Sequence, residues 1–200
     1  MFIEFKEEAL HILSYSYPMV LIAIIVASSL RITYLIINKE KFILYKELLK
    51  LSFIIYILCL FHAVTYQDVS FSNANFIPFK EITRYDFGSS LFYRNILGNL
   101  LLFIPFGIFS SYYVKINKSY LVIILSFIAS LSIELTQLLI GRVFDVDDII
   151  LNVLGGLIGY ILYKIFKKFE NNLPTLFRKD LVRNIVSILI LGGLVWFLVR

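Results

Sequence analysis

The residues best suited to chemistry in this chain are polar and charged side chains that interrupt apolar runs. Asn95 and Asn99 are four residues apart, and Glu134 and Gln137 are three apart, so each pair shares one face of a helix. Such groups are costly in hydrocarbon unless they are paired or hydrated, which makes them candidates for binding. The candidate ligand-binding residues are Arg94, Asn95, Asn99, Glu134, Gln137, Arg142, Asp145, Asp148 and Asn152.

Glu134 is the strongest single candidate, because it lies well inside an apolar run. A carboxylate there should either take part in function or pair with a cation, and Arg94 and Arg142 are the nearest choices. A carboxyl group at this position would also permit acid–base chemistry. The sequence assigns no catalytic residue, and Glu134 is the best candidate for one.

Four acidic residues could supply oxygen ligands to Mg²⁺ or Ca²⁺, namely Glu134, Asp145, Asp147 and Asp148. They do not form the Asp-x-Asp-x-Asp-Gly run with a closing Glu that calcium loops carry. No His or Cys pair has the spacing of a zinc site either. We therefore expect no metal site and no cofactor.

The composition indicates an integral membrane protein. Hydrophobic residues make up 60% of the 200 residues, against about 45–50% in soluble domains. Because these residues collect in long runs, we predict one all-α, polytopic transmembrane helical bundle over residues 1–200, with five to six spans. A basic segment, 164–183, is expected on the membrane surface before the last span. The predicted spans are 9–30, 51–66, 91–113, 120–140, 149–166 and the short run 185–199.

The positions of Lys and Arg predict the orientation. Of the 19 such residues, 13 fall in the segments 31–50, 115–118 and 164–183, which the positive-inside rule places in the cytoplasm. Segments 67–90 and 141–148 are then extracytoplasmic. The net charge of +5 fits this bias, and we expect no nucleic-acid partner. This topology brings the polar residues of the third, fourth and fifth spans together in their outer halves.

Two features of these spans are expected to be structural. Pro105 removes a backbone donor within the third span, which predicts a kink. Gly155, Gly156 and Gly159 lie near one face of the fifth span and would let another helix or a ligand approach closely. A bundle that binds no ligand, with its polar residues serving only as hydrogen-bonding contacts between helices, is the simplest alternative reading.

Several motifs together resemble the VanZ-like family over residues 75–160. They are Asn-x-x-Pro-Phe at 75–79, Arg-Asn-x-x-Gly-Asn-x-x-x-Phe-x-Pro-x-Gly at 94–107, Glu-x-x-Gln at 134–137 and Gly-Arg-x-x-Asp-x-Asp-Asp-x-x-x-Asn-x-x-Gly-Gly at 141–156. The resemblance implies a multi-pass bacterial plasma-membrane protein. The family is named for a protein of glycopeptide-resistance gene clusters that reduces susceptibility to teicoplanin.

The resemblance and the polar cluster together lead to one hypothesis with two alternatives. We expect an outward-facing polar site within the bilayer that binds a lipoglycopeptide or the head group of an envelope lipid. The alternatives are an enzyme that modifies a lipid-linked envelope precursor, with Glu134 as general base or metal ligand, and a transporter of lipid or drug. The sequence does not fix the oligomeric state.

Overall fold

The computed structural model describes residues 2–65, 74–86, 88–89 and 92–199. The side chains of residues 2–16, 94, 194–195 and 197–199 lie outside this description. Within the described ranges the chain is helical, with one isolated β-bridge and no longer strand. The helices are α1 (Phe2–Asn38), α2 (Leu44–Thr65), η1 (Tyr93–Leu97), α4 (Gly98–Val114), α5 (Ser119–Leu139), α6 (Val146–Asn172), η2 (Thr175–Arg178) and α7 (Asp180–Val199).

Five of these helices are long and apolar enough to cross a membrane. The candidate spans are Tyr17–Asn38, Leu44–Thr65, Asn95–Val114, Ser119–Leu139 and Val146–Asn172. The predicted class, an all-α polytopic bundle, is confirmed, and the chain is a multi-pass membrane protein. Residues 185–199 lie within α7, and their role as a sixth span stays a prediction.

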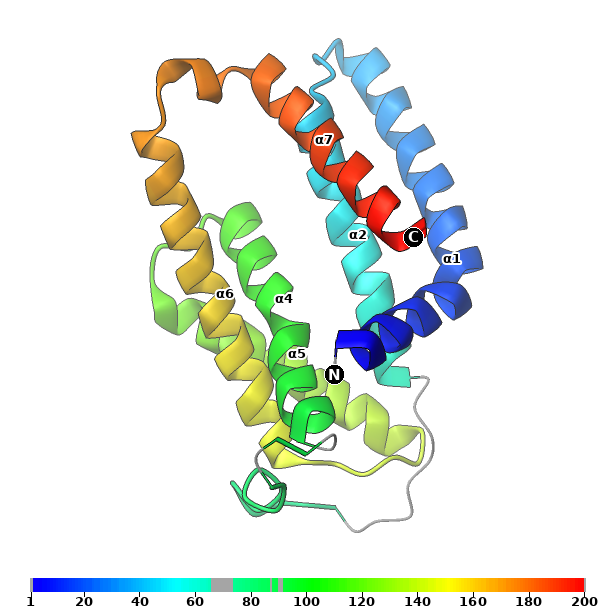
Figure 1. Ribbon diagram of the computed structural model, residues 1–200, viewed down its shortest axis with the longest axis vertical. Coiled ribbons are helices and arrows are strands. Elements are labelled where there is room, and N and C mark those ends of the chain that lie inside the picture. The colour runs from blue at the N-terminus through cyan, green and yellow to red at the C-terminus, as the bar shows by residue number, and fades with distance from the viewer. Residues whose placement is uncertain (1, 66–73, 87, 90–91, 200) are drawn as a thin grey trace. The chain divides into compact units, whose positions relative to one another are not determined.

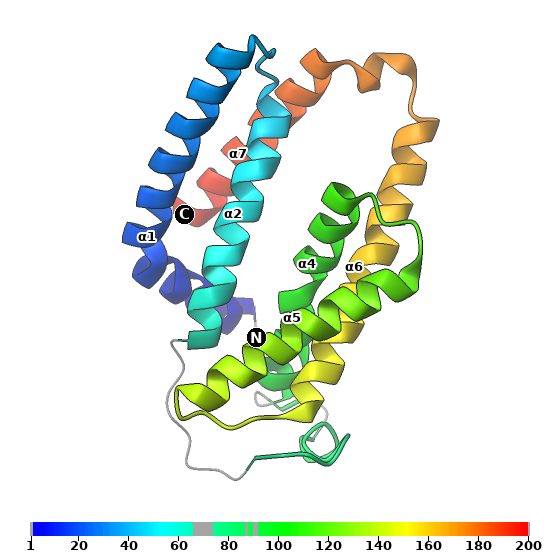
Figure 2. The ribbon, with the colours of Figure 1, turned by 180° about the vertical axis from the view of Figure 1, so that it is seen from behind.

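The chain divides into two compact units, which are described separately. The first unit holds residues 1–14 and 59–166, and the second holds residues 15–58 and 167–200. In the first unit, α4, α5 and α6 lie side by side (Figures 1 and 2). This unit contains the candidate polar residues, and the packing of these three helices sets the positions of their side chains.

Glycines bring α6 into backbone contact with α4. A Cβ atom added at Gly155 would lie 2.2 Å from the Leu100 carbonyl oxygen, and one added at Gly159 would lie 2.1 Å from that of Ile104. A Cβ atom at Gly107 would likewise meet the Gly156 carbonyl oxygen at 2.0 Å. Real Cβ atoms do not approach so closely, so the two helices can pack at this separation only with glycine at these positions.

The buried face of α5 is polar along much of its length. Its buried residues recur every three to four positions, as Val122, Ser126, Ser130, Glu134 and Gln137. Large apolar side chains such as Ile124, Phe127, Ile128 and Leu135 point outward. This pattern reverses that of a helix in a soluble protein, and it suits a helix with lipid outside and polar partners inside.

The second unit is held together by polar contacts near the ends of its helices. Arg31 of α1 donates to both carboxylate oxygens of Glu47 of α2, at 2.9 and 3.1 Å. The Tyr45 backbone N–H donates to Asn184 Oδ1 of α7 at 3.0 Å. The basic segment 164–183 comprises the last residues of α6, the η2 turn and the start of α7. Helix α6 thus continues past the predicted end of the fifth span and stops before Pro174, which cannot continue it.

Candidate functional site

Two loops far apart in the sequence meet at one end of the first unit. Asn75 forms an isolated parallel bridge with Asp145. The Asn75 N–H donates to the Phe144 carbonyl at 2.8 Å, and the Asn75 carbonyl accepts from the Val146 N–H at 3.1 Å. The Asn75 side chain also donates to Asp145 Oδ1 at 2.8 Å. Residues 74–86 and 141–148 therefore lie at the same end of the helices, which the predicted topology requires.

Asp147 fixes the shape of the loop 74–86. Its carboxylate accepts three backbone hydrogen bonds, from Phe79 N (2.5 Å), Glu81 N (2.7 Å) and Ile82 N (3.2 Å). Phe79 has a positive φ of 64°, which turns the chain so that these N–H groups face one carboxylate. Asp147 is 1% exposed. Its oxygens are thus already occupied by the loop, in a role that sequence reasoning missed.

Glu134 lies deep between the helices, with 1% of its surface exposed. Its Oε2 accepts from the Asp145 backbone N–H at 2.9 Å. The Gln137 amide fits its neighbours when its nitrogen donates to Glu134 Oε1 (2.9 Å) and its oxygen accepts from Arg142 Nη1 (2.6 Å). Gln137 therefore links the carboxylate to the guanidinium, so each oxygen of Glu134 has a donor of fixed position.

Arg142 reaches this position from the turn that ends α5. Gly141 has a φ of +83°, which side-chain-bearing residues rarely adopt. The Arg142 N–H donates to the Gln137 carbonyl at 2.8 Å, and its Nη1 donates to the Val64 carbonyl at 2.6 Å. Burial lowers the pKa of Arg142, and the charges of Glu134 and Asp148 oppose that shift. The side chain thus brings a positive charge to two carboxyl groups.

Two further contacts tie α6 to its neighbours through amide side chains. Asn99 of α4 donates its Nδ2 to Asp148 Oδ1. Asn152, one turn along α6, donates its Nδ2 to Ser130 Oγ of α5 at 2.9 Å. Asn152 is 3% exposed, and its Oδ1 has no hydrogen-bond partner. A buried carbonyl oxygen without a donor is costly, so it marks a place where a further polar group fits.

These side chains surround a cavity of about 150 Å³, which we call the inner cavity. Its polar lining consists of seven of the predicted residues, whereas Ala63, Val64, Leu102 and Ile133 supply its apolar lining. The seven polar residues are Asn95, Asn99, Glu134, Gln137, Arg142, Asp148 and Asn152.

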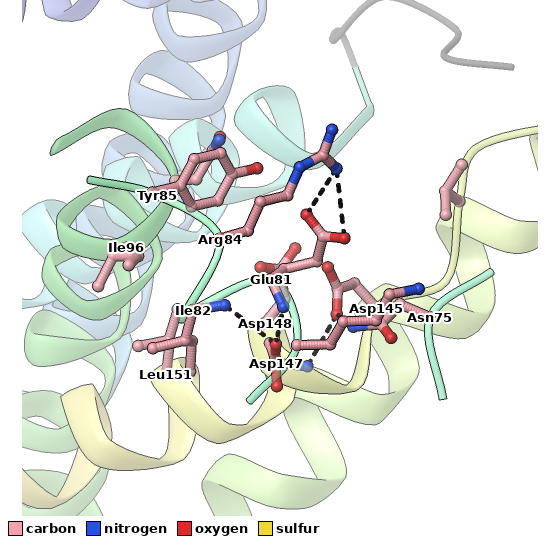
Figure 3. A pocket seen from close by; sticks show the side chains of 13 residues that line it. Asn75, Glu81, Ile82, Arg84, Tyr85, Ile96, Asp145, Asp147, Asp148 and Leu151 are labelled. Carbon is pink, nitrogen blue, oxygen red and sulfur yellow. Dashed lines mark hydrogen bonds and ion pairs between the residues drawn. The ribbon is translucent and has the colours of Figure 1, made fainter. Parts of the chain in front are cut away.

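A second cavity of about 370 Å³, the outer cavity, adjoins the inner one (Figure 3). Asn95 and Asp148 line both. The loop 74–86 contributes charged residues to the outer cavity, and Figure 3 shows Arg84 paired with Glu81, at 3.1 Å. The remaining polar lining residues are Asn75, Lys80, Tyr85, Asp145 and Asp147.

Asp145 connects the two loops at the edge of the outer cavity. Its Oδ1 accepts from both the Asn75 side chain and the Asp147 backbone N–H, at 2.8 and 2.9 Å. The second bond places Asp145 before the first turn of α6, as a helix cap. Burial raises the pKa of Asp145, while these two hydrogen bonds act in the opposite direction.

The predicted residues separate into three groups in the structure. Seven line the inner cavity, Asp145 lines only the outer one, and the Arg94 side chain lies outside the described residues. Gly155, Gly156 and Gly159 pack against α4 and α5 and do not line the two cavities. Pro105 lies within α4. Among the described residues, the acids form no group of the kind that holds a metal ion.

The sequence prediction missed the residues that the loop 74–86 brings to the outer cavity. Lys80, Glu81 and Tyr85 were not singled out, although the Asn-x-x-Pro-Phe motif begins five residues before Lys80. That motif was the available signal. Its Asn75 pairs with Asp145, and its Phe79 supplies the first of the three N–H groups that bind Asp147.

A profile of the VanZ/LLP1 family matches residues 48–167, which include all lining residues of both cavities. No curated protein matches the chain, and no solved structure does.

Proposed function

The chain belongs to the VanZ/LLP1 family, and from this starting point we propose that it is a bacterial plasma-membrane protein whose inner cavity binds the head group of an amphiphile. The amphiphile is an envelope lipid or a lipoglycopeptide of the teicoplanin type. The positive-inside orientation places the cavity toward the outer face of the membrane, where both kinds of molecule are found.

One observation carries the proposal: membrane-spanning helices with apolar outer faces enclose a cavity with seven polar lining residues. Burying these groups among the helices is expensive. Fewer polar residues would suffice to hold three helices together, since the glycines already bring α4 and α6 into backbone contact. A cavity with charged and amide groups at fixed positions is instead typical of ligand recognition.

The geometry favours binding over catalysis by Glu134. A general base needs a lone pair directed at the proton that it removes. Both oxygens of Glu134 accept hydrogen bonds, one from Asp145 N and one from Gln137. We therefore assign Glu134 a positioning role, in which it orients Gln137 and, through it, Arg142.

The test is the susceptibility of a glycopeptide-sensitive Gram-positive host that expresses the chain, its Glu134→Gln variant or a Glu40→Gln control, at equal membrane abundance. Glu40 belongs to the second unit, and its side chain is 45% exposed. We expect at least a fourfold loss of teicoplanin susceptibility with the unmodified chain and the control, and no change with Glu134→Gln. Vancomycin, which lacks an acyl chain, should be affected less.

The antibiotic part and the binding part of the proposal can fail separately. If teicoplanin susceptibility does not change with any form, the lipoglycopeptide is not the ligand, and the envelope lipid remains. If the purified protein in detergent also shows no saturable binding of any amphiphile, the binding proposal itself is wrong.

A further inference from the structure

The inner cavity contains a buried hydrogen-bond acceptor, Asn152 Oδ1, that has no partner among the described residues. The Asp148 carboxyl group accepts from Asn99 through one of its two oxygens. On the donor side, the Asn99 and Asn152 amides bind Asp148 and Ser130. Arg142 Nη1 binds the Gln137 oxygen and the Val64 carbonyl. A group that satisfies Asn152 Oδ1 must donate a hydrogen bond.

The charges lining the cavity point to the same kind of group. Glu134 and Asp148 are acidic, and Arg142 is the single cation among the lining residues that the structure describes. With both carboxyl groups ionised, the lining carries one more negative than positive charge. A bound cation would balance this charge and stabilise the ionised form of its neighbours.

We propose that the inner cavity recognises a primary ammonium group, which donates to Asp148 and to Asn152 Oδ1. This inference rests on the proposed function and names the part of the head group that is bound. An ammonium has three donors and no acceptor, which matches the unpartnered Asn152 oxygen and the carboxyl group of Asp148 beside it. Asp148 and Asn152 are four residues apart on α6, so both face the same space.

The size and access of the cavity fit such a group. A cavity of this kind holds one water when its volume exceeds about 10–15 Å³. The inner cavity, at about 150 Å³, can therefore take an aminoalkyl group with a few methylenes. Asn95 and Asp148 line both cavities, so the rest of the head group can extend into the outer cavity. There Lys80 offers a positive charge to a phosphate beside the amine, whereas Arg84 pairs with Glu81.

The test compares lipids that share one acyl chain and differ in whether the head group carries a free amine. The purified full chain in neutral detergent is titrated with lysophosphatidylethanolamine, its N-acetylated form and lysophosphatidylglycerol, all with the same acyl chain. We expect the first to bind at least tenfold more tightly than the other two. Free ethanolamine is a fourth probe, because it separates a lipid-borne amine from a soluble one.

Two variants locate the contact. Asp148→Asn removes the charge but keeps an oxygen for Asn99, and it should reduce the preference for the free amine to less than threefold. Asp180→Asn, at the start of α7, is the matched control and should keep the full preference. The comparison of the two ethanolamine probes on the unmodified chain does not depend on any variant folding.

The outcomes separate this inference from the proposed function. Equal binding of the three lipids, weakened in each case by Glu134→Gln, would mean that the cavity binds head groups but does not select amines. Binding of none of them would overturn the inference, and the proposed function would fall as well only if teicoplanin susceptibility also stayed unchanged. A preference that survives Asp148→Asn in full would place the amine outside the inner cavity and contradict the inference.

Discussion

The packing of α4 against α6 predicts a large effect from one methyl group. In Gly159→Ala the new Cβ atom would lie 2.1 Å from the Ile104 carbonyl oxygen. It would also lie 3.0 Å from two further backbone atoms, Gly107 Cα and Ile108 N. All three neighbours belong to the backbone of α4, so no side-chain rotation can relieve the contact.

The cost follows from the distance that must be recovered. Real Cβ atoms essentially never come within 3.0 Å of another heavy atom, so the oxygen and the methyl group must separate by at least 0.9 Å. Moving α6 away from α4 would also loosen the close approach of Gly155 to Leu100. Overpacking of this kind costs about 1–3 kcal/mol. Alanine gains about 0.5–1 kcal/mol over glycine inside a helix, which offsets only part of this cost.

The assay uses Cys59, the single cysteine, as a reporter of thermal unfolding. Its thiol is half-buried, and unfolding in detergent should expose it to a fluorogenic maleimide. Gly193→Ala in α7 is the matched control, because a Cβ atom there would meet nothing within 4 Å. We expect a lower unfolding temperature for Gly159→Ala and an equal or higher one for the control. Equal stability of Gly159→Ala and the unmodified chain would refute the backbone contact between the two helices.

Two further predictions concern the loops around the outer cavity. Asp147→Ala removes the acceptor of three N–H groups in the loop 74–86, so the amide hydrogen-exchange rates of Phe79, Glu81 and Ile82 should rise at least tenfold. Asp147→Asn should give intermediate rates. Unchanged rates would contradict the role assigned to Asp147. Burial raises the pKa of Asp145, so the stability it confers is present at low pH and lost as pH rises through that pKa. Asp145→Asn keeps the acceptor oxygen and removes the charge, so its unfolding temperature should increase relative to that of the unmodified chain as the pH rises from about 4. A relative decrease over this range would show that the ionised carboxylate is the stabilising form.

The sequence was sufficient to predict which polar residues share a helix face. Helical spacing pairs Glu134 with Gln137, and the alternation of spans brings that pair toward Asn99 and Asp148. All four line the inner cavity. The spacing of residues allows this prediction because the apolar runs show where the helices begin and end. Once the extent of a helix is known, the direction of each side chain follows from its position.

The contacts made by the loops could not be predicted from residue spacing. The bridge between Asn75 and Asp145 joins residues 70 positions apart, and no periodic pattern encodes it. The sequence shows Asp147 only as one of four acids with oxygen ligands, because its loop partners are backbone N–H groups that carry no sequence signal. The π-helical turn η1, which precedes α4, could not be predicted from the composition either. Main-chain contacts depend on turn geometry, which the pattern of side chains in the sequence predicts only weakly.

The polar inner face of α5 has a consequence for biosynthesis. The chain is made from its N-terminus, so Glu134 leaves the ribosome before Asp145, whose N–H satisfies one of its oxygens. Ser130 likewise leaves before Asn152 of α6, which donates to it. Inserted alone, α5 would expose a carboxyl group and two serines to lipid. We expect α5 and α6 to leave the insertion machinery together as a hairpin, with α5 held at a hydrated site until the turn after Leu139 has formed.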